Sequence, residues 1–257
     1  MITPGSITSS LEQLFKMGVV INTVVDVGAA DGHFGLAHYP LFPGALLVNI
    51  DANRIYEPSL KSIAEVMGGH YVIAAVSDTP GNVEITTSAH PYWNSMRGEG
   101  DAYWELINDL RTGKETVTAL TLDSLANTFP LRAPYLLKLD IQGAEELALR
   151  GGARFLRDTD VVICEADARD FDTLHRLISD AGFDLFDIAD LHRLQDNRLG
   201  WFYPIYLSRR HNGLRTTQVW DPAENDRVIQ AQVERRKQVL EANEAYLARY
   251  RAQRAKT

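Results

Sequence analysis

VVDVGAADGHFG, at residues 24–35, is followed after a polar turn by LLVNID, at residues 46–51. The two apolar runs and the glycine-containing turn between them predict a strand, a turn that opens a helix, and a second strand. An acid that closes a strand about 20 residues after a glycine turn is typical of a nucleotide-binding βαβ unit. Gly28 would allow a tight turn close to a ligand, and Asp51 would accept hydrogen bonds from ribose hydroxyls.

The turn also indicates which nucleotide it suits. A dinucleotide site would read G-x-G-x-x-G, whereas Ala30 stands at the position of the second glycine. Asp26 and Asp31 place acids at the turn, and acids favour a cationic or zwitterionic ligand over a pyrophosphate. S-adenosylmethionine (SAM) has a sulfonium, an ammonium and a ribose but no phosphate. Two alternatives stay open: a tight turn in another kind of α/β protein, and a nicotinamide-dependent oxidoreductase, which the broken fingerprint disfavours.

Size and composition limit the classes of protein that the sequence can represent. A chain of 257 residues suffices for one large α/β domain, with or without an appendage. The net charge of -8 and the pI near 5.4 argue against a general nucleic-acid binder. The single cysteine, Cys164, lies in an apolar run and is expected to be a buried thiol, compatible with a reducing compartment. The sequence shows neither a signal-peptide pattern nor an apolar run of membrane-spanning length, so we expect a soluble, cytoplasmic protein.

Apolar runs alternate with helical patterns along the chain, which predicts a mostly parallel sheet with right-handed crossovers. The last two runs are joined by a short turn, so one strand is expected to be antiparallel. This seven-stranded arrangement is the layout of class I methyltransferases, a Rossmann-type fold. The strands are predicted at Thr23–Val27, Leu46–Ile50, His70–Ser77, Tyr135–Ile141, Asp160–Asp167, Leu185–Leu194 and Phe202–Ser208.

The sequence resembles the FkbM-family methyltransferases, which depend on SAM and have the class I fold. The resemblance extends from Val24 to about Leu207 and is most specific in the lysine- and aspartate-containing block before Gly151-Gly152-Ala153. The matching segments are VVDVGAADGHFG, VNIDAN, TLDSL, YLLKLDIQGAEELALRGGARFL, VVICEAD and AGFDLF. The resemblance implies methyl transfer to an oxygen, often a hydroxyl of a sugar or of a polyketide-type natural product.

The resemblance also implies a set of binding residues. Asp51 would hold the ribose, and Ser77 and Asp78 would lie near the adenine. Asp140, just past the fourth strand, would face the reaction centre. The methionine part of SAM would be lined by Gly28, Ala29, Asp31 and Gly32, with Asp26 before the turn.

The residue patterns along the sequence predict three parts of the chain. Residues 1–22 carry a helix at Ser9–Gly18, with a capping box of Ser9 and Glu12, that covers the cofactor end. Residues 23–210 form the methyltransferase domain. Residues 221–252 form a long helix that begins at Pro222 and packs on the domain or joins subunits into a homo-oligomer.

A sugar hydroxyl is a poor nucleophile, so a base or a metal should help to remove its proton. Asp140 is the first candidate for either role; alternatively, its carboxylate only binds the SAM ammonium or a backbone amide. Glu165, at the end of the next strand, could complete a Mg²⁺ site with Asp140, since oxygen ligands suit that ion. Gln142 is neutral where many members of the resembled family carry Glu, which weakens the case for a metal.

Other polar residues are weaker candidates. Lys138 lies two residues before Asp140 and could orient the carboxylate or the substrate, or be structural. His90 is the histidine to test as a base, although a lone loop histidine is more often solvated, and His33 could contact the cofactor or the acceptor. Glu145 is expected to be a helix-start acid.

The aromatic segment at residues 90–104 is predicted to be a lid or binding loop; alternatively, its aromatic residues fill a small core beside the sheet. The function predicted from the whole sequence is a SAM-dependent O-methyltransferase for a saccharide or glycosylated metabolite. The alternative is a non-catalytic SAM-binding protein whose C-terminal helix serves as an interaction module.

Overall fold

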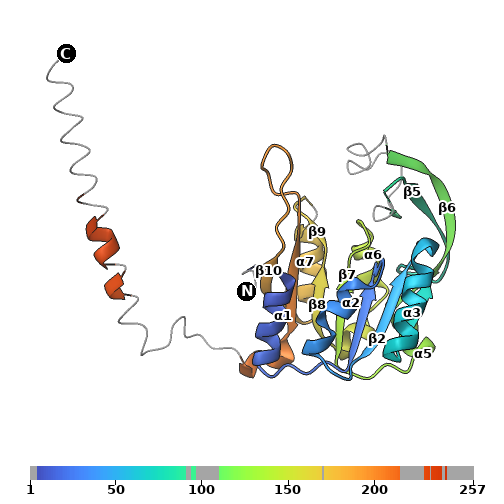
Figure 1. Ribbon diagram of the computed structural model, residues 1–257, viewed down its shortest axis with the longest axis horizontal. Coiled ribbons are helices and arrows are strands. Elements are labelled where there is room, and N and C mark those ends of the chain that lie inside the picture. The colour runs from blue at the N-terminus through green and yellow to red at the C-terminus, as the bar shows by residue number, and fades with distance from the viewer. Residues whose placement is uncertain are drawn as a thin grey trace, which may run out of the picture. The chain divides into compact units, whose positions relative to one another are not determined.

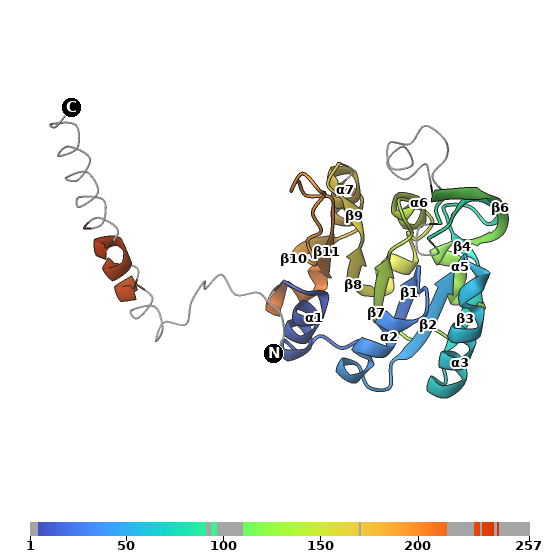
Figure 2. The same cartoon turned by 45° about the horizontal axis from the view of Figure 1, so that its top comes forward.

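The computed structural model describes residues 5–90, 94–96, 110–169, 171–214, 229–231, 233–238 and 241. The chain divides into two compact units, Met1–Gly213 and Leu214–Thr257. The first unit is an α/β structure built on one large twisted sheet (Figures 1 and 2). The boundaries predicted for the three parts of the chain stay predictions.

The large sheet has the strand order β10-β11-β8-β7-β1-β2-β3, and the short strand β9 pairs with β11. Strands β3, β2, β1, β7 and β8 are parallel, and β11 is antiparallel to both of its neighbours. The predicted mostly parallel sheet with one antiparallel strand is therefore confirmed, and β9 is an eighth strand beyond the seven predicted. The strands are β1 (Thr23–Val27), β2 (Leu46–Asp51), β3 (His70–Ile73), β7 (Tyr135–Leu139), β8 (Thr159–Cys164), β9 (Ala166–Asp167), β10 (Phe183–Ala189) and β11 (Trp201–Ser208).

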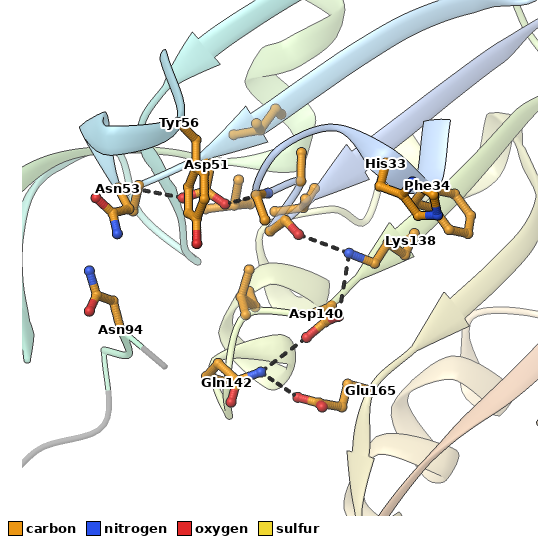
Figure 3. A pocket seen from close by; sticks show the side chains of 18 of the residues that line it. His33, Phe34, Asp51, Asn53, Tyr56, Asn94, Lys138, Asp140, Gln142 and Glu165 are labelled. Carbon is orange, nitrogen blue, oxygen red and sulfur yellow. Dashed lines mark hydrogen bonds and ion pairs between the residues drawn. The ribbon is translucent and has the colours of Figure 1, made fainter. Parts of the chain in front are cut away.

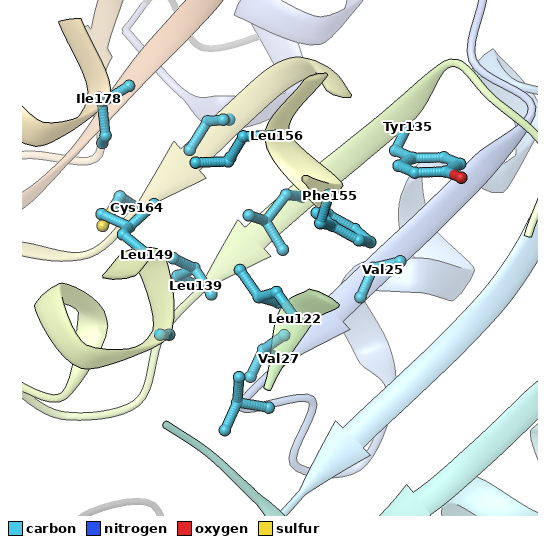
Figure 4. Close-up of a cluster of buried hydrophobic side chains, with 14 of the residues drawn as sticks. Val25, Val27, Leu122, Tyr135, Leu139, Leu149, Phe155, Leu156, Cys164 and Ile178 are labelled. Atoms are coloured by element: carbon cyan, nitrogen blue, oxygen red, sulfur yellow. The ribbon is translucent and has the colours of Figure 1, made fainter. Parts of the chain in front are cut away.

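Both faces of this sheet are buried, because every residue of the central strands β1 and β7 is buried. Val25 and Leu137 belong to one core cluster, while their neighbours Val24 and Leu136 belong to another on the opposite face. Cys164 is buried in the first cluster, as predicted (Figure 4). The first core includes residues of α5 (Leu122–Thr128), α6 (Glu145–Arg150), η5 (Phe155–Asp158) and α7 (Phe171–Asp180).

On the other face lie α1 (Ile7–Lys16), α2 (His33–His38), η1 (Tyr39–Leu41) and α3 (Glu57–Met67), preceded by the single turn η2 (Arg54–Tyr56). The N-terminal helix begins two residues earlier than predicted. Its capping box joins Ser6 and Ser9, because Ser6 is the residue in extended conformation before the first turn. Thus Ser9 and Glu12 do not form the predicted box. Ile7 and Thr8, at the start of α1, line the cavity described below.

A second, three-stranded sheet of order β4-β6-β5 was not predicted as a unit. It contains β4 (Ala75–Val76), β5 (Gly81–Ser88) and β6 (Arg111–Leu120). The run predicted as one strand at His70–Ser77 breaks at Ala74, whose N–H donates to the carbonyl of Asp51. Beyond this break the chain leaves the large sheet and pairs with β6 instead.

Two predicted segments lie largely outside the described residues. Of the aromatic loop at residues 90–104, only His90 and residues 94–96 are described. Of the long C-terminal helix at 221–252, residues 229–231, 233–238 and 241 are described and are helical. Its role in oligomerisation stays a prediction. Within the described part of the chain, no helix has both the length and the apolar character needed to cross a membrane.

Candidate active site

A cavity of about 800 Å³ lies where the carboxyl ends of four neighbouring strands meet. The residues that follow β1, β2, β7 and β8 all contribute to its wall (Figure 3). This edge is where ligands bind in open α/β sheets, because the loops diverge there. The polar lining includes Asp31, His33, Asp51, Asn53, Tyr56, Asn94, Ser95, Lys138, Asp140, Gln142, Glu165, Asp190, His192 and Tyr203.

The turn after β1 depends on Gly28. Its φ of 75° lies in the left-handed region, and a Cβ at this position would collide with the backbone carbonyl of Asp140. The turn continues through Ala30, which also has a positive φ, of 47°. This conformation points the N–H of Ala30 at Oδ2 of Asp51, 2.8 Å away. The glycine turn therefore brings the first and second strand ends together at one wall of the cavity.

Asp51 is held from two sides. Its Oδ2 accepts from Ala30, and its Oδ1 accepts the N–H of Asn53 at 2.7 Å. Burial raises the pKa of this carboxyl, and the two backbone N–H groups oppose that rise. Each oxygen keeps a second lone pair, so Asp51 can also accept hydrogen bonds from a diol such as the ribose of a nucleoside. The geometry of this wall therefore fits the nucleoside part of SAM.

Lys138 is a buried cation at the floor of the cavity. Its Nζ donates to the carbonyl of Gly28 at 2.8 Å and lies 3.1 Å from Oδ1 of Asp26 and 3.4 Å from Oδ2 of Asp140. Asp26 and Lys138 are register partners on β1 and β7, which explains why both side chains meet on one face. Burial alone would lower the pKa of Lys138, but the charges of Asp26 and Asp140 raise it above its ordinary value. The lysine is therefore a fixed positive charge.

Asp140 and Glu165 form a carboxyl pair that is bridged by two donors. The Nε2 amide of Gln142 donates to Oδ1 of Asp140 at 3.1 Å and to Oε2 of Glu165 at 3.0 Å (Figure 3). The hydroxyl of Tyr203 lies 3.1 Å from Oδ2 of Asp140 and 3.5 Å from Oε1 of Glu165. Burial and the neighbouring charge of Asp140 raise the pKa of Glu165 well above its ordinary value. The pair therefore carries one charge more readily than two.

These two bridges do not fit the predicted Mg²⁺ site. A cation between Asp140 and Glu165 would have to displace the amide hydrogens of Gln142 and the hydroxyl of Tyr203, both of which are donors to the carboxylates. Among the described residues, no group of three His, Cys, Asp or Glu side chains is arranged to hold a metal ion.

Gln142 is held in place by its backbone. Its φ of 55° is unusual for a residue with a side chain, and its carbonyl accepts the hydroxyl of Ser95 at 2.5 Å. Glu145, at the start of α6, is buried and accepts the N–H of Ile141 at 2.8 Å. Burial raises the pKa of Glu145 to about 7. The predicted helix-start acid thus also fixes the loop that carries Asp140 and Gln142.

The structure brings only some of the predicted site residues to the cavity. Asp26 and Gly32 do not line it; Asp26 is fully buried behind Lys138. The residues on its wall are Gly28, Ala29, Asp31, His33, Asp51, Lys138, Asp140 and Glu165.

Ser77, Asp78 and His90, by contrast, do not line the cavity. Ser77 follows β4 into the small sheet, where its N–H donates to Leu120, and Asp78 after it is exposed. The residues that reach the cavity from this segment are Ala74, Ala75 and Val76. His90 is exposed beyond β5, with its N–H on Ser88. The predicted adenine contacts of Ser77 and Asp78 therefore have no support in this geometry, and neither does a catalytic His90.

Sequence reasoning missed Tyr203. The antiparallel register pairs Ile205 with Ile163 and Trp201 with Asp167, which puts Tyr203 opposite Glu165. A prediction would have required the pairing of β11 with β8, and the sequence alone does not contain that register.

Comparison with known proteins gives one family match. The model of the methyltransferase FkbM domain matches residues 26–185, more than half of the chain. No curated protein matches the chain. Among solved structures, methyltransferase FkbM from Methylobacillus flagellatus KT is 16% identical with a TM-score of 0.48; the match covers 73% of this chain and 43% of that one.

Two further structures are similar at the same distant level. An rRNA methylase from Streptococcus thermophilus is 12% identical, with a TM-score of 0.43 and coverage of 81% of this chain and 98% of that one. M. capricolum TrmK, solved with S-adenosyl-homocysteine, is 8% identical, with a TM-score of 0.44 and coverage of 83% and 72%. These similarities are too distant to assign a substrate or a site residue.

Proposed function

This chain belongs to the FkbM methyltransferase family, and from that premise we propose that it methylates a hydroxyl oxygen of a saccharide or of a glycosylated natural product. SAM supplies an activated methyl group when it is bound. The protein then has three tasks: to hold the cofactor, to align the acceptor oxygen, and to take up the hydroxyl proton.

The cofactor is held, in this proposal, by the turn after β1 and by Asp51. Asp51 presents two oxygens that are already oriented by backbone N–H groups, so binding a ribose diol requires little rearrangement. The backbone of Gly28 and Ala29 lies along the cavity between Asp51 and Asp140. The methionine part of SAM would extend along this backbone toward the end of β7.

The observation that supports O-methylation is the environment of Asp140. Its carboxylate lies on the cavity wall, with Lys138 on one side and the Tyr203 and Gln142 donors on the others. A carboxylate that is oriented in this way can accept a proton from a hydroxyl as the oxygen attacks. The raised pKa of Glu165 favours its neutral form, so Glu165 does not compete with Asp140 for the role of base. Asp140 is therefore the proposed general base, and Lys138 and Tyr203 fix its orientation.

The chemistry of the rest of the wall supports a polyhydroxylated acceptor. Side-chain amides of Asn94 and Gln142 and the hydroxyl of Ser95 lie on the wall with Asp140, and they can donate to or accept from sugar hydroxyls. Ser95 and Gln142 already have partners within the protein, and their oxygens can accept further hydrogen bonds from the hydroxyls of an acceptor.

The test uses the purified chain, methyl-labelled SAM, and saccharide and small-molecule fractions of a cell extract. We expect label in a saccharide-containing fraction, with a product stable to mild base as an ether is. Asp140→Asn should lose at least about 100-fold in turnover while its SAM affinity stays within twofold, and Asp51→Ala should lose SAM affinity. Label only in protein or nucleic acid, or full turnover by Asp140→Asn, would refute the proposal.

A further inference from the structure

The chain between β10 and β11 forms a hairpin that extends one wall of the cavity. The N–H of His192 donates to the carbonyl of Trp201 at 2.8 Å, and the N–H of Gly200 donates back to His192 at 2.9 Å. Farther out, the N–H of Leu194 donates to the carbonyl of Arg198, and the N–H of Asn197 donates to the carbonyl of Leu194. Figure 1 shows this extension as the orange loop that rises beyond β10. The methyltransferase function does not by itself account for it.

At the base of this hairpin, an aromatic pair faces the cavity. The rings of His192 and Trp201 are stacked, with centroids 4.9 Å apart and planes inclined by 12°. Leu191, His192 and Trp201 all line the cavity, and Leu191 is exposed. We call these three residues the aromatic platform. Because His192 covers one face of the indole, the exposed area of Trp201 lies on its other face and its edge.

The platform lies at the opposite end of the cavity from the nucleoside wall. Asp51 ends β2 and Trp201 begins β11, and the strand order places β1, β7 and β8 between them. Four strand spacings of about 4.8 Å separate the two by roughly 19 Å. Asp140, after β7, lies midway. A cofactor that extends from Asp51 to Asp140 therefore leaves the platform for the acceptor.

Trp201 also lies next to Tyr203, which contacts the proposed base. Trp201 and Tyr203 are two residues apart on β11, so their side chains share a face and lie about 7 Å apart. The Tyr203 hydroxyl reaches Asp140 at 3.1 Å. A ring that rests on Trp201 can thus present a hydroxyl to Asp140.

The charges around this end of the cavity are mainly negative. Asp140 and Asp190 line it as acids, and Glu165 beside them adds little charge because its pKa is raised well above its ordinary value. The nearest lysine, Lys138, is neutralised by Asp26 and Asp140 and donates to the carbonyl of Gly28. A carboxylate or phosphate on the acceptor would meet these acids with no free lysine to offset them among the described lining residues.

We propose that the aromatic platform binds the C–H face of an uncharged, hydroxyl-bearing ring and that the acids beside it reject anionic rings. The electron-rich face of an indole suits the apolar C–H face of a sugar, while the hydroxyls at the ring edge remain available for polar partners. This inference rests on the proposed function. It adds to that function the place where the acceptor ring binds and the requirement that the ring carries no negative charge.

The test compares two probes that differ in one group, 4-nitrophenyl β-glucoside and 4-nitrophenyl β-glucuronide. Binding of each to the full chain is measured by saturation-transfer NMR with S-adenosyl-homocysteine bound. We expect the glucoside to bind at least tenfold more tightly than the glucuronide. Trp201→Ala should weaken glucoside binding at least fivefold, whereas Trp201→Phe should stay within about twofold because it keeps a stacking face.

Ile188→Ala is the matched control. Ile188 is 39% exposed, against 38% for Trp201, and lies on the adjacent strand β10 without lining the cavity. It should leave glucoside binding unchanged. Absence of glucoside binding, equal binding of the glucuronide, or no effect of Trp201→Ala would overturn the proposal. Separately measured SAM affinity and label transfer report on the proposed function, so its failure is distinguishable from failure of the platform.

Discussion

The hydroxyl of Tyr203 donates to Oδ2 of Asp140 across 3.1 Å, although the two residues are 63 positions apart in the chain. The same carboxylate oxygen lies 3.4 Å from the ammonium of Lys138. One oxygen of the proposed base is therefore fixed by a phenol and a cation, and the other is fixed by the Gln142 amide. This arrangement orients the carboxylate before any acceptor arrives.

Tyr203→Phe removes one of these hydrogen bonds without changing the ring. We expect turnover to fall about 10–100-fold, because a hydrogen bond to a charged group contributes about 1.5–3 kcal/mol. SAM affinity should stay within twofold, since Asp51 is untouched. Tyr206→Phe is the control: Tyr206 lies on the same strand with its hydroxyl 3.3 Å from His175, outside the cavity. Equal losses in the two variants would contradict a specific role for Tyr203.

Lys138→Met should destabilise the fold itself. Its ammonium compensates Asp26, which is fully buried, so the variant leaves a carboxyl without its counter-charge. Breaking such a pair costs about 3–5 kcal/mol of unfolding free energy, measured by urea denaturation. The double variant Asp26→Asn, Lys138→Met should recover part of this loss. Lys114→Met removes an exposed ion pair with Glu84 and should cost less than about 1 kcal/mol.

Local sequence patterns correctly predicted the strand ends and turns that carry the site. The glycine turn, Asp51 and the block around Asp140 could be placed because each follows an apolar run that must be a buried strand, and parallel strands end at one edge. The family match and the observed sheet confirm the fold.

The other residues of the site depend on which strands pair and in which register, and a single sequence does not reveal either. The family resemblance implies that Ser77 lies near the adenine, but the predicted strand His70–Ser77 breaks at Ala74 and the chain beyond it pairs with β6 in the second sheet. Tyr203 was missed because only the antiparallel pairing of β11 with β8 and β9 places it beside Glu165. Gln142 was considered only as a missing metal ligand, whereas its left-handed backbone makes it a bridge between carboxylates.

Gly28→Ala tests the close approach of two loops. The new Cβ would meet the carbonyl of Asp140, in addition to the strain of a positive φ. We expect loss of SAM binding, measured calorimetrically, together with a clear fall in melting temperature. Gly44→Ala isolates the strain: its φ is 82°, and its added Cβ would meet nothing within 4 Å. That control should cost only about 1–2 kcal/mol and keep SAM binding. Similar behaviour of the two variants would refute the role given to the contact.

Stability should depend on pH through Glu145. The pKa of its buried carboxyl rises from 4.5 to about 7 on folding, so the folded state binds this proton more tightly than the unfolded chain does. Raising the pH from about 5 to 7.5 therefore favours unfolding, by about 2 kcal/mol for this group. Glu145→Gln keeps an acceptor for the N–H of Ile141 but cannot ionise, so urea denaturation should show a correspondingly flatter profile. Parallel profiles for the two proteins would contradict the assignment.

Gln142→Glu should convert the carboxyl pair into a metal site. The substitution replaces the amide that bridges Asp140 and Glu165 with a third carboxylate, which gives the oxygen-rich, negative environment that Mg²⁺ and Mn²⁺ prefer. Without metal, repulsion should lower turnover at least tenfold, and calorimetry should detect Mn²⁺ binding that the unsubstituted chain lacks. Gln142→Met removes the bridge without adding charge and should bind no Mn²⁺. Turnover of the unsubstituted chain should change less than twofold with EDTA; a larger loss there would mean that a metal displaces Gln142 in the working enzyme.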